Sequence, residues 1–136
     1  FTFQVNATDD PGGDYDVSLM TTTVFEAEHS EDDTTIAALA YEASDDQAQA
    51  AGFQILAEGI GYGGDESVAG ELHLFNPAST TYVKHFYATT NDYRHSDSSR
   101  QTFVGGYIND TTAIDDIQFK MTSGNFDGTI KMYGVG

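Results

Sequence analysis

Short runs in which apolar and polar residues alternate are the feature of this sequence that most constrains its fold. Residues 71–75 read Glu-Leu-His-Leu-Phe, and residues 117–121 read Ile-Gln-Phe-Lys-Met. Successive side chains of a β-strand point to opposite faces, so this alternation indicates strands with one face in a core and the other in solvent. The sequence shows no convincing long helix.

Runs of this kind recur about nine times at intervals of roughly 8–15 residues, and turns rich in Gly, Asp and Asn separate them. The alanine-rich residues 36–41 are ambiguous between helix and strand, and residues 44–51 could form one or two helical turns. Such a profile is typical of an antiparallel sandwich or barrel. We expect a single all-β domain over residues 1–136, an antiparallel, jelly-roll-like β-sandwich. Its predicted strands lie in residues 1–5, 15–28, 36–41, 53–60, 71–75, 82–90, 101–109, 114–122 and 129–135.

The last two runs predict a hairpin that covers the core. Ile117, Phe119 and Met121 share one face of the first strand. Ile130 and Met132 would join them from the returning strand. We expect this hairpin to have one dry face and one wet face.

Charge and composition argue against nucleic acid as a partner and against a membrane span. The chain has 22 Asp and Glu against 5 Lys and Arg, a formal net charge of -17. Nucleic acid is excluded as a partner, because neutralising phosphates needs clustered Lys and Arg. No apolar run approaches the roughly 18 residues that a membrane span needs. The chain begins with Phe1, which indicates either a removed leader or an incomplete sequence.

Motifs that carry catalysis are missing from the sequence. The four histidines have no tight metal-ligand spacing, and cysteine is absent, which excludes disulfides and thiolate metal sites. No nucleophile elbow, zinc-protease pair or phosphate-binding glycine loop occurs. A hydrolase with two catalytic carboxylates stays open in principle, but 22 carboxylates offer no way to nominate the pair. We expect a non-enzymatic protein.

Three groups of residues are candidate binding or modification sites. A turn rich in carboxylates has the ligand type that calcium prefers, although its spacing is not that of a calcium loop. A polar loop combines an aromatic ring with arginines, which suits contact with a neutral glycan or a protein partner. Two sequons would accept N-glycans on an exported protein. The calcium candidates are Asp9, Asp10, Asp14 and Asp16, the contact candidates Tyr93, Arg94, His95 and Arg100, and the sequon asparagines Asn6 and Asn109.

The first residues form a candidate assembly strand. Phe1, Phe3 and Val5 alternate with polar residues in residues 1–7, and the Gly- and Asp-rich residues 8–14 follow as a hinge. Such an arm could pair with the sheet edge of a neighbouring subunit and build a homo-oligomer or helical polymer. It could equally pair within its own domain. The sequence leaves both arrangements open.

A series of motifs between residues 59 and 134 resembles a family of tailed-bacteriophage virion proteins found in tail-fibre and head-associated modules. The motifs are GELHLFNPAS at residues 70–79, YVKH at 82–85, GGY at 105–107, AIDDI at 113–117, SGNF at 123–126 and GTIKMYG at 128–134. The resemblance implies a non-enzymatic jelly-roll sandwich in a virion or extracellular assembly, as fibre, filament or decoration protein. It carries over no catalytic residues. The alternative is a carbohydrate- or receptor-binding module of a tail fibre.

Overall fold

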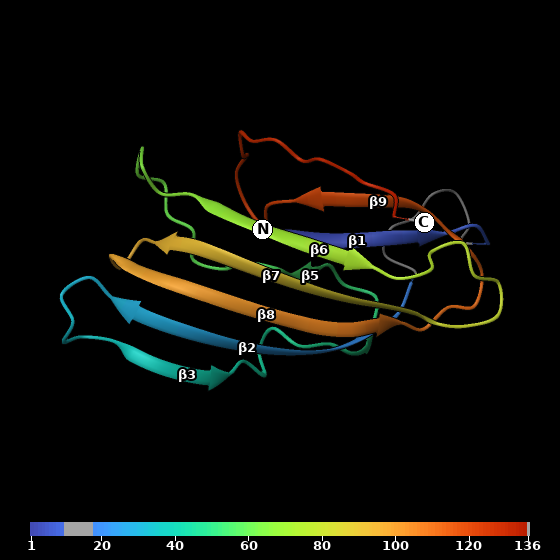
Figure 1. The fold of residues 1–136 in the computed structure, drawn as a ribbon, viewed down its shortest axis with the longest axis horizontal. Helices are drawn as coiled ribbons and strands as arrows, with labels where there is room; N and C mark the ends of the chain where they lie inside the picture. Colours follow the sequence, from blue (N-terminus) through green and yellow to red (C-terminus); the bar gives the residue numbers. More distant parts are fainter. Residues whose placement is uncertain (10–17, 136) are drawn as a thin grey trace.

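The computed structural model describes residues 1–9 and 18–135, which form nine strands and no helix. The all-β expectation is therefore confirmed for this part of the chain, and the ambiguous alanine-rich run at residues 36–41 contains a strand. The predicted strand at residues 53–60 shrinks to two residues. The strands, labelled in Figure 1, are β1 (Thr2–Ala7), β2 (Met20–Ser30), β3 (Ala37–Tyr41), β4 (Ala48–Ala50), β5 (Gln54–Ile55), β6 (Val68–Leu74), β7 (Lys84–Arg94), β8 (Ser98–Ile108) and β9 (Ile114–Lys120).

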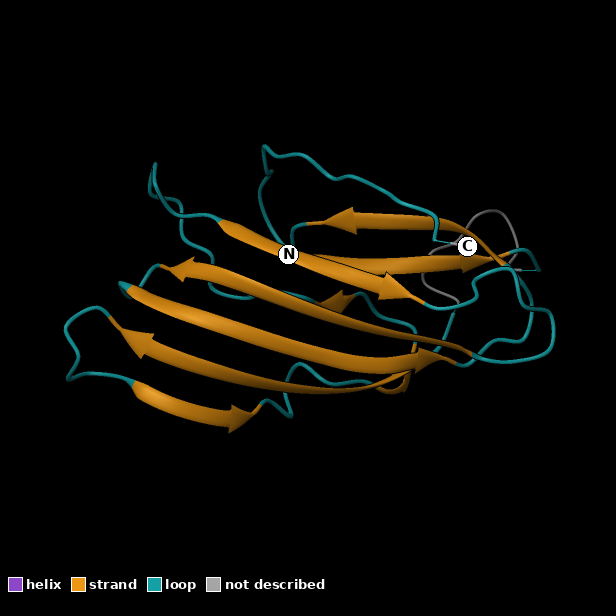
Figure 2. Cartoon of the chain, viewed as in Figure 1, coloured by secondary structure: helices purple, strands orange, loops and turns teal. Residues whose placement is uncertain are grey.

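Two antiparallel sheets of unequal width make the β-sandwich, as the two layers in Figure 2 show. The large sheet has six strands in the order β3-β2-β8-β7-β6, with β4 paired to β2 beside β3. The small sheet has three strands in the order β5-β1-β9. Strands β7 and β8 are eleven residues each and pair along their full length, so they form the central ribbon of the large sheet.

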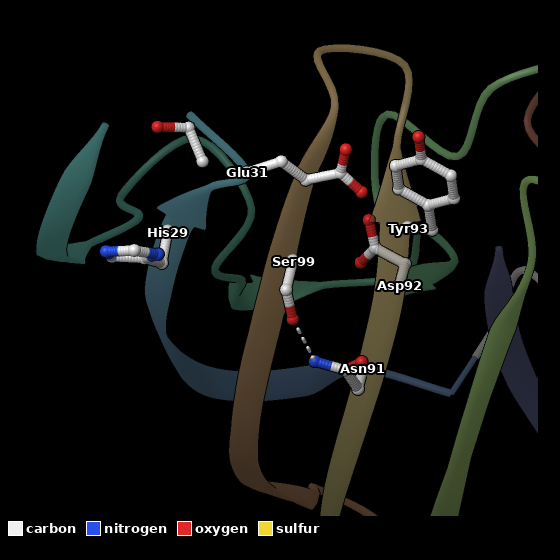
Figure 3. A pocket seen from close by; sticks show the side chains of 7 residues that line it. His29, Glu31, Asn91, Asp92, Tyr93 and Ser99 are labelled. Atoms are coloured by element: carbon white, nitrogen blue, oxygen red, sulfur yellow. Dashed lines mark hydrogen bonds between the residues drawn. The ribbon is translucent and has the colours of Figure 1, made fainter. Parts of the chain in front are cut away.

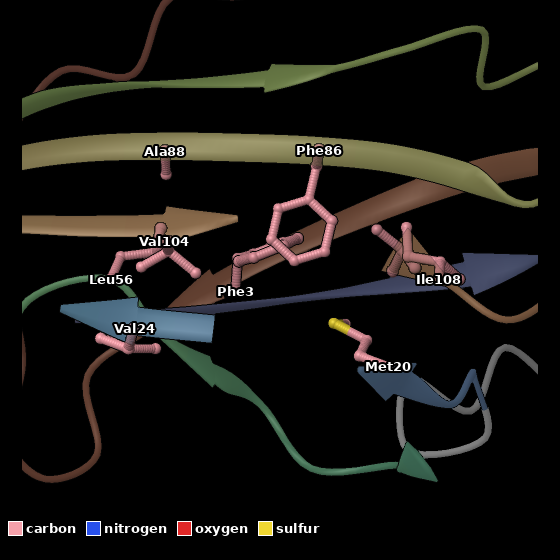
Figure 4. Close-up of a cluster of buried hydrophobic side chains, with 9 residues drawn as sticks. Phe3, Met20, Val24, Leu56, Phe86, Ala88, Val104 and Ile108 are labelled. Carbon is pink, nitrogen blue, oxygen red and sulfur yellow. The ribbon is translucent and has the colours of Figure 1, made fainter. Parts of the chain in front are cut away.

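The hydrophobic core lies between β1 and one half of the large sheet (Figure 4). Phe3 of β1 packs edge-to-face on Phe86 of β7, with ring centroids 5.0 Å apart. Alternation puts these side chains inward, because each is separated from the next inward residue of its strand by one outward residue. The other buried members are Val5, Met20, Val24, Leu56, Ala88, Val104 and Ile108.

Strand β1 pairs within its own chain. It lies between β5 and β9, and all six of its residues are buried, including the polar ones. Thr2 Oγ1 donates to the Lys120 carbonyl at 3.0 Å, and Gln4 Nε2 donates to the Ala51 carbonyl at 2.8 Å. Of the two arrangements left open for residues 1–7, the structure therefore has the one inside the domain. Most of the predicted hinge, residues 10–14, lies outside the described residues.

The predicted hairpin over residues 117–135 is wrong. Residues 129–135 form no strand, and Ile130 and Met132 are 52% and 77% exposed. Strand β9 pairs instead with β1, a strand more than a hundred residues away in sequence. The alternation of residues 117–121 correctly predicted a strand with Ile117 and Phe119 facing the core, and both side chains are half-buried there. The pattern carried no information on which strand would pair with it.

Substitutions in the two places distinguish the observed core from the predicted one. We expect Phe3→Ala to lower the free energy of unfolding by about 3–5 kcal/mol, because it leaves a cavity against Phe86. Met132→Ala in the exposed segment should change it by less than about 0.5 kcal/mol. Urea unfolding at low protein concentration measures both. If Met132→Ala lowered the free energy of unfolding as much as Phe3→Ala does, Met132 would belong to the core and the predicted hairpin would be supported.

Candidate functional site

The outer edge of the large sheet is formed by β3, a strand whose sequence is Ala-Ala-Leu-Ala-Tyr. It pairs with β2 on one side, from Phe25 opposite Tyr41 to His29 opposite Ala37. All five residues are exposed, with Leu39 at 74% and Tyr41 at 57%. The main-chain groups on the other side of β3 have no strand partner in the described part of the chain.

The other sheet-ending strands carry features that discourage pairing with another chain. Strand β6 has Glu71 at its centre, with its Oε2 3.3 Å from His73 Nε2. Strands β4 and β5 are too short to offer a long edge, with three and two residues. Strand β9 includes Asp115, Asp116 and Lys120. Natural proteins blunt sheet edges with charges and short strands, because an open edge is a template for another strand. Strand β3 has neither protection, so it is the candidate functional site.

Both faces of β3 are open to solvent. Ala38 lies opposite Glu28 and Ala40 opposite Glu26, so these alanines point to the inner side of the large sheet. Glu26 is buried there, yet both alanines are exposed. The small sheet therefore covers the inner side of β2 and stops short of β3. A strand added beside β3 would extend the large sheet without displacing any part of the chain that the structure describes.

Residues 129–135 form a second unpartnered element, which we call the 129–135 segment. All seven residues are exposed, and no hydrogen bond joins them to the rest of the described chain. The preceding Phe126 packs edge-to-face on Phe1, with ring centroids 5.3 Å apart. The segment is thus attached to the small sheet by an aromatic contact just before it begins.

Lys131 in this segment differs from the other cations. Lys84 is buried and donates through Nζ to the carbonyls of Asp110 and Thr112. Lys120 lies over the Phe53 ring, 3.5 Å from its centroid. The two arginines form ion pairs, described below. Within residues 1–9 and 18–135, Lys131 is the one Lys or Arg for which the structure shows no hydrogen bond, ion pair or ring contact.

A buried charge cluster closes the half of the sandwich that β1 does not fill with apolar side chains. Arg100 of β8 is 1% exposed. Its guanidinium nitrogens lie 3.5 Å from Asp92 Oδ1, 3.4 Å from Glu26 Oε2 and 3.8 Å from Glu58 Oε2. Thr102 Oγ1 also donates to Glu26 Oε1 at 3.1 Å. Strands β2, β7 and β8 thus place opposite charges together in the interior.

The attraction of Arg100 does not fully offset the cost of burying the carboxylates in this cluster. Burial raises the pKa of Asp92 and of Glu26, and this effect exceeds the opposing attraction of Arg100. Asp92 Oδ2 and Arg100 Nη2 are buried without a hydrogen-bond partner. Ion pairs of this kind seldom add net stability, but removing one partner is costly because the other charge stays buried. The cluster is therefore a structural feature that is sensitive to protonation.

A second ion pair lies nearer the end of the same strands. Arg94 Nη1 donates to Glu28 Oε2 at 2.8 Å, and Ser98 Oγ donates to Glu28 Oε1 at 2.5 Å. Burial opposes ionisation of Glu28, but the hydrogen bonds from Ser98 and Arg94, with the charge of Arg94, lower its pKa overall.

The predicted contact loop is therefore not assembled at the surface. Arg100 is interior and has no surface to offer to a glycan or a protein, and Arg94 is held by Glu28. Tyr93 donates to Asp97 Oδ1 at 3.3 Å, and His95 Nδ1 lies 3.0 Å from the Gly59 carbonyl. These four residues close the β7–β8 turn against the loop that follows β5.

The structure describes the two sequon asparagines and one of the four calcium candidates. Asn6 is buried in β1, which withholds it from a glycan in the folded chain, whereas Asn109 is exposed and donates to Gln49 Oε1 at 2.6 Å. Asp9 Oδ1 accepts from Thr112 Oγ1 at 2.6 Å. The other calcium candidates, Asp10, Asp14 and Asp16, lie outside the described residues. Within those residues, no group of three or more His, Cys, Asp or Glu could hold a metal ion.

The outer face of the large sheet combines aromatic pairs with a shallow polar pocket. Phe25 and Phe103 stack across β2 and β8 with centroids 4.7 Å apart, and His73 and Tyr87 stack across β6 and β7 at 4.5 Å. Cross-strand ring pairs of this kind stabilise a sheet directly. The pocket, of about 320 Å³, is drawn in Figure 3, and its lining residues are His29, Ser30, Glu31, Asn91, Asp92, Tyr93 and Ser99.

Comparisons with known proteins add no relative. No protein-family model, curated protein or solved structure matches this chain. The resemblance to phage virion proteins therefore stays a prediction. The described residues contain no helix with the length and apolar character needed to cross a lipid bilayer.

Sequence reasoning missed both β3 as an edge and the buried cluster. An uncharged run of five residues was the available signal for β3, but its ambiguity between helix and strand concealed its place in the sheet. For Arg100 the available signal was its position in the alternating pattern of the strand. It lies two residues before Thr102 and four before Val104, so the alternation that points these side chains inward also points Arg100 inward.

The buried cluster predicts that stability rises as the pH falls through the raised pKa values of Asp92 and Glu26. A carboxyl group whose pKa is raised by folding binds its proton first in the folded state, so lowering the pH through that pKa favours folding. We expect Asp92→Asn to flatten the dependence of the unfolding free energy on pH above the unfolded pKa of about 3.9. Urea unfolding from about pH 8 down to about pH 4, the lower end set by the unfolded pKa, measures this slope.

The control for this experiment is Asp127→Asn, which removes the same charge from an exposed position. It should retain the wild-type slope, because the buried Asp92 is still present in it. Any effect of lowering the negative net charge is the same in the two variants, so a difference between them reports on burial of Asp92. Equal slopes for Asp92→Asn and the wild type would contradict the assigned role of Asp92.

Proposed function

We propose that this chain is a non-enzymatic structural subunit that associates with copies of itself through its sheet edges. The observation that carries the proposal is β3, a fully exposed edge strand without a charged residue. An edge of this kind offers a row of unpaired N–H and C=O groups, and a strand from another molecule can satisfy them. Protein sheets that are not used for association seldom leave such an edge unprotected.

The ionisable residues of the interior support a structural role. Arg94, Arg100, Glu28 and Asp92 are used in ion pairs between strands, where they close the sandwich. The resemblance of residues 59–134 to tailed-phage virion proteins is the reason for proposing a virion or extracellular assembly. The alternative of a glycan-binding module stays a prediction, and of the two arginines expected to serve it Arg100 is interior while Arg94 is paired with Glu28.

Net charge sets the conditions under which copies can associate. Each copy carries a formal charge of -17, so two copies repel one another at low ionic strength. The screening length falls from about 30 Å at 0.01 M salt to about 3 Å at 1 M salt. Contacts between edges act at short range and survive this screening. Association should therefore strengthen as salt is added.

A charge placed on the β3 edge should prevent association. We expect the average mass of the wild type in sedimentation velocity to increase with protein concentration, and more so in 1 M salt. Leu39→Asp should weaken association at least about tenfold, which corresponds to about 1.4 kcal/mol, because an aspartate at the edge blocks pairing.

Tyr62→Asp is the matched control, because Tyr62 is a fully exposed aromatic residue outside the strands and the charge change is the same. It should associate like the wild type. A wild type that stays monomeric at every concentration and salt would overturn the proposed function. Equal association of Leu39→Asp and Tyr62→Asp would remove β3 from it.

A further inference from the structure

We propose that the 129–135 segment of one copy pairs as a strand with β3 of the next copy. This inference rests on the proposed function, because it names the element that occupies the open edge. The occupant is a second copy of this chain, and the assembly is joined head to tail.

The 129–135 segment has the composition of a strand and pairs with no strand in the described part of the chain. Its sequence, Thr-Ile-Lys-Met-Tyr-Gly-Val, is rich in β-branched and aromatic residues, which favour strands. Ile130 and Met132 would share one face, with Tyr133 and Val135 on the other. All four side chains are exposed in the single chain, so pairing with another subunit would remove apolar surface from water.

The donor and the acceptor match in length and in chemistry. The 129–135 segment has seven residues, enough to span the five residues of β3. Strand β3 presents neither a charge nor a proline that would oppose a new neighbour. The small inward side chains of Ala38 and Ala40 leave its inner face open, so the added strand would simply widen the large sheet.

Charge complementarity favours this donor over other segments. Acidic residues flank β3 on both sides, with Glu31, Asp32 and Asp33 before it and Glu42 after it. Lys131 is the one Lys or Arg with no hydrogen-bond, ion-pair or ring partner within the described residues. A strand that brings Lys131 to this edge would offset part of the repulsion between two copies that are each strongly negative.

The positions of donor and acceptor make the contact propagate. Figure 1 shows β3 at one edge of the sandwich and the chain end after β9 at the opposite edge. The packing of Phe126 on Phe1 keeps the start of the segment against the small sheet, while residues 129–135 form no hydrogen bond with the rest of the described chain. A contact between two different surfaces leaves a free donor and a free acceptor on every pair. It therefore builds a fibre, or a ring if the rotation closes.

The competing arrangement lies within one chain. The segment could turn back onto the free edge of β9 and close the hairpin that local alternation predicts. Strand β9 contains Asp115 and Asp116, and the structure shows no hydrogen-bonded ladder between β9 and the 129–135 segment. Pairing with β9 would give monomers, so the two arrangements are distinguished by complementation between variants.

The test uses full-length chains in sedimentation velocity at 1 M salt. Met132→Pro removes a backbone donor from the segment without breaking any hydrogen bond among the residues that the structure describes. Leu39→Asp blocks the acceptor. Each variant alone should be monomeric, whereas a one-to-one mixture should form dimers, because the intact segment of Leu39→Asp can pair with the intact β3 of Met132→Pro. Met132→Leu is the control and should assemble like the wild type.

The outcomes separate this inference from the proposed function. Assembly of Met132→Pro to the wild-type extent would overturn the donor segment and leave association through β3 standing. A mixture that stays monomeric would overturn the pairing of this donor with this acceptor. A monomeric wild type would overturn both proposals. Ala38→Asp serves as a second acceptor variant if Leu39→Asp does not fold, and the same results are expected from it.

Discussion

The structure depends on the difference in width between its two sheets. A sheet must bury one face, and here a three-stranded sheet covers a six-stranded one. Apolar side chains from β2, β7 and β8 gather where β1 lies over them, and Phe3 is central to that contact. The remaining inner surface of the large sheet needs a different closure. Strand β3 lies beyond the cover altogether.

The buried charge cluster is the closure for part of this uncovered surface. Arg100 enters the interior with carboxylates from β2 and β7 and from the segment after β5. The desolvation of these groups opposes much of their mutual attraction, which is why burial raises the pKa of Asp92. A cluster of this kind contributes little net stability. It fixes how the strands meet at that end and makes the fold responsive to pH.

Local alternation was enough to predict the fold class and most of the long strands, because which side chains point inward is a property of each strand by itself. The pairing of strands was not predictable in this way. The alternating run at 129–135 has the pattern of a core strand, yet the place beside β9 that faces the core belongs to β1. The uncharged run at residues 37–41 is consistent with an edge strand, but its exposure could not be predicted because it results from the width of the opposite sheet. The charge of Arg100 favours a surface position, but Arg100 lies four residues before Val104 in β8, so both side chains point to the same, inner face of the strand.

The uncovered strand and the unbonded segment have a common explanation if each completes the other in a neighbouring copy. A sheet edge with no protection and a strand-forming segment with no partner are both unfavourable in a chain that stays alone. Together they form an interface that exists only between molecules. The negative charge of each copy opposes formation of that interface at low ionic strength.

Amide hydrogen exchange of the full chain, below and above the concentration at which it assembles, tests the central claim most directly. Exchange should slow on assembly in residues 37–41 and in residues 129–135 together, because the same new hydrogen bonds protect both. The buried strand β1 should be protected equally in the two states. Protection that appears in neither region, or in 129–135 already at the lowest concentration, would contradict the exchange of this segment between copies.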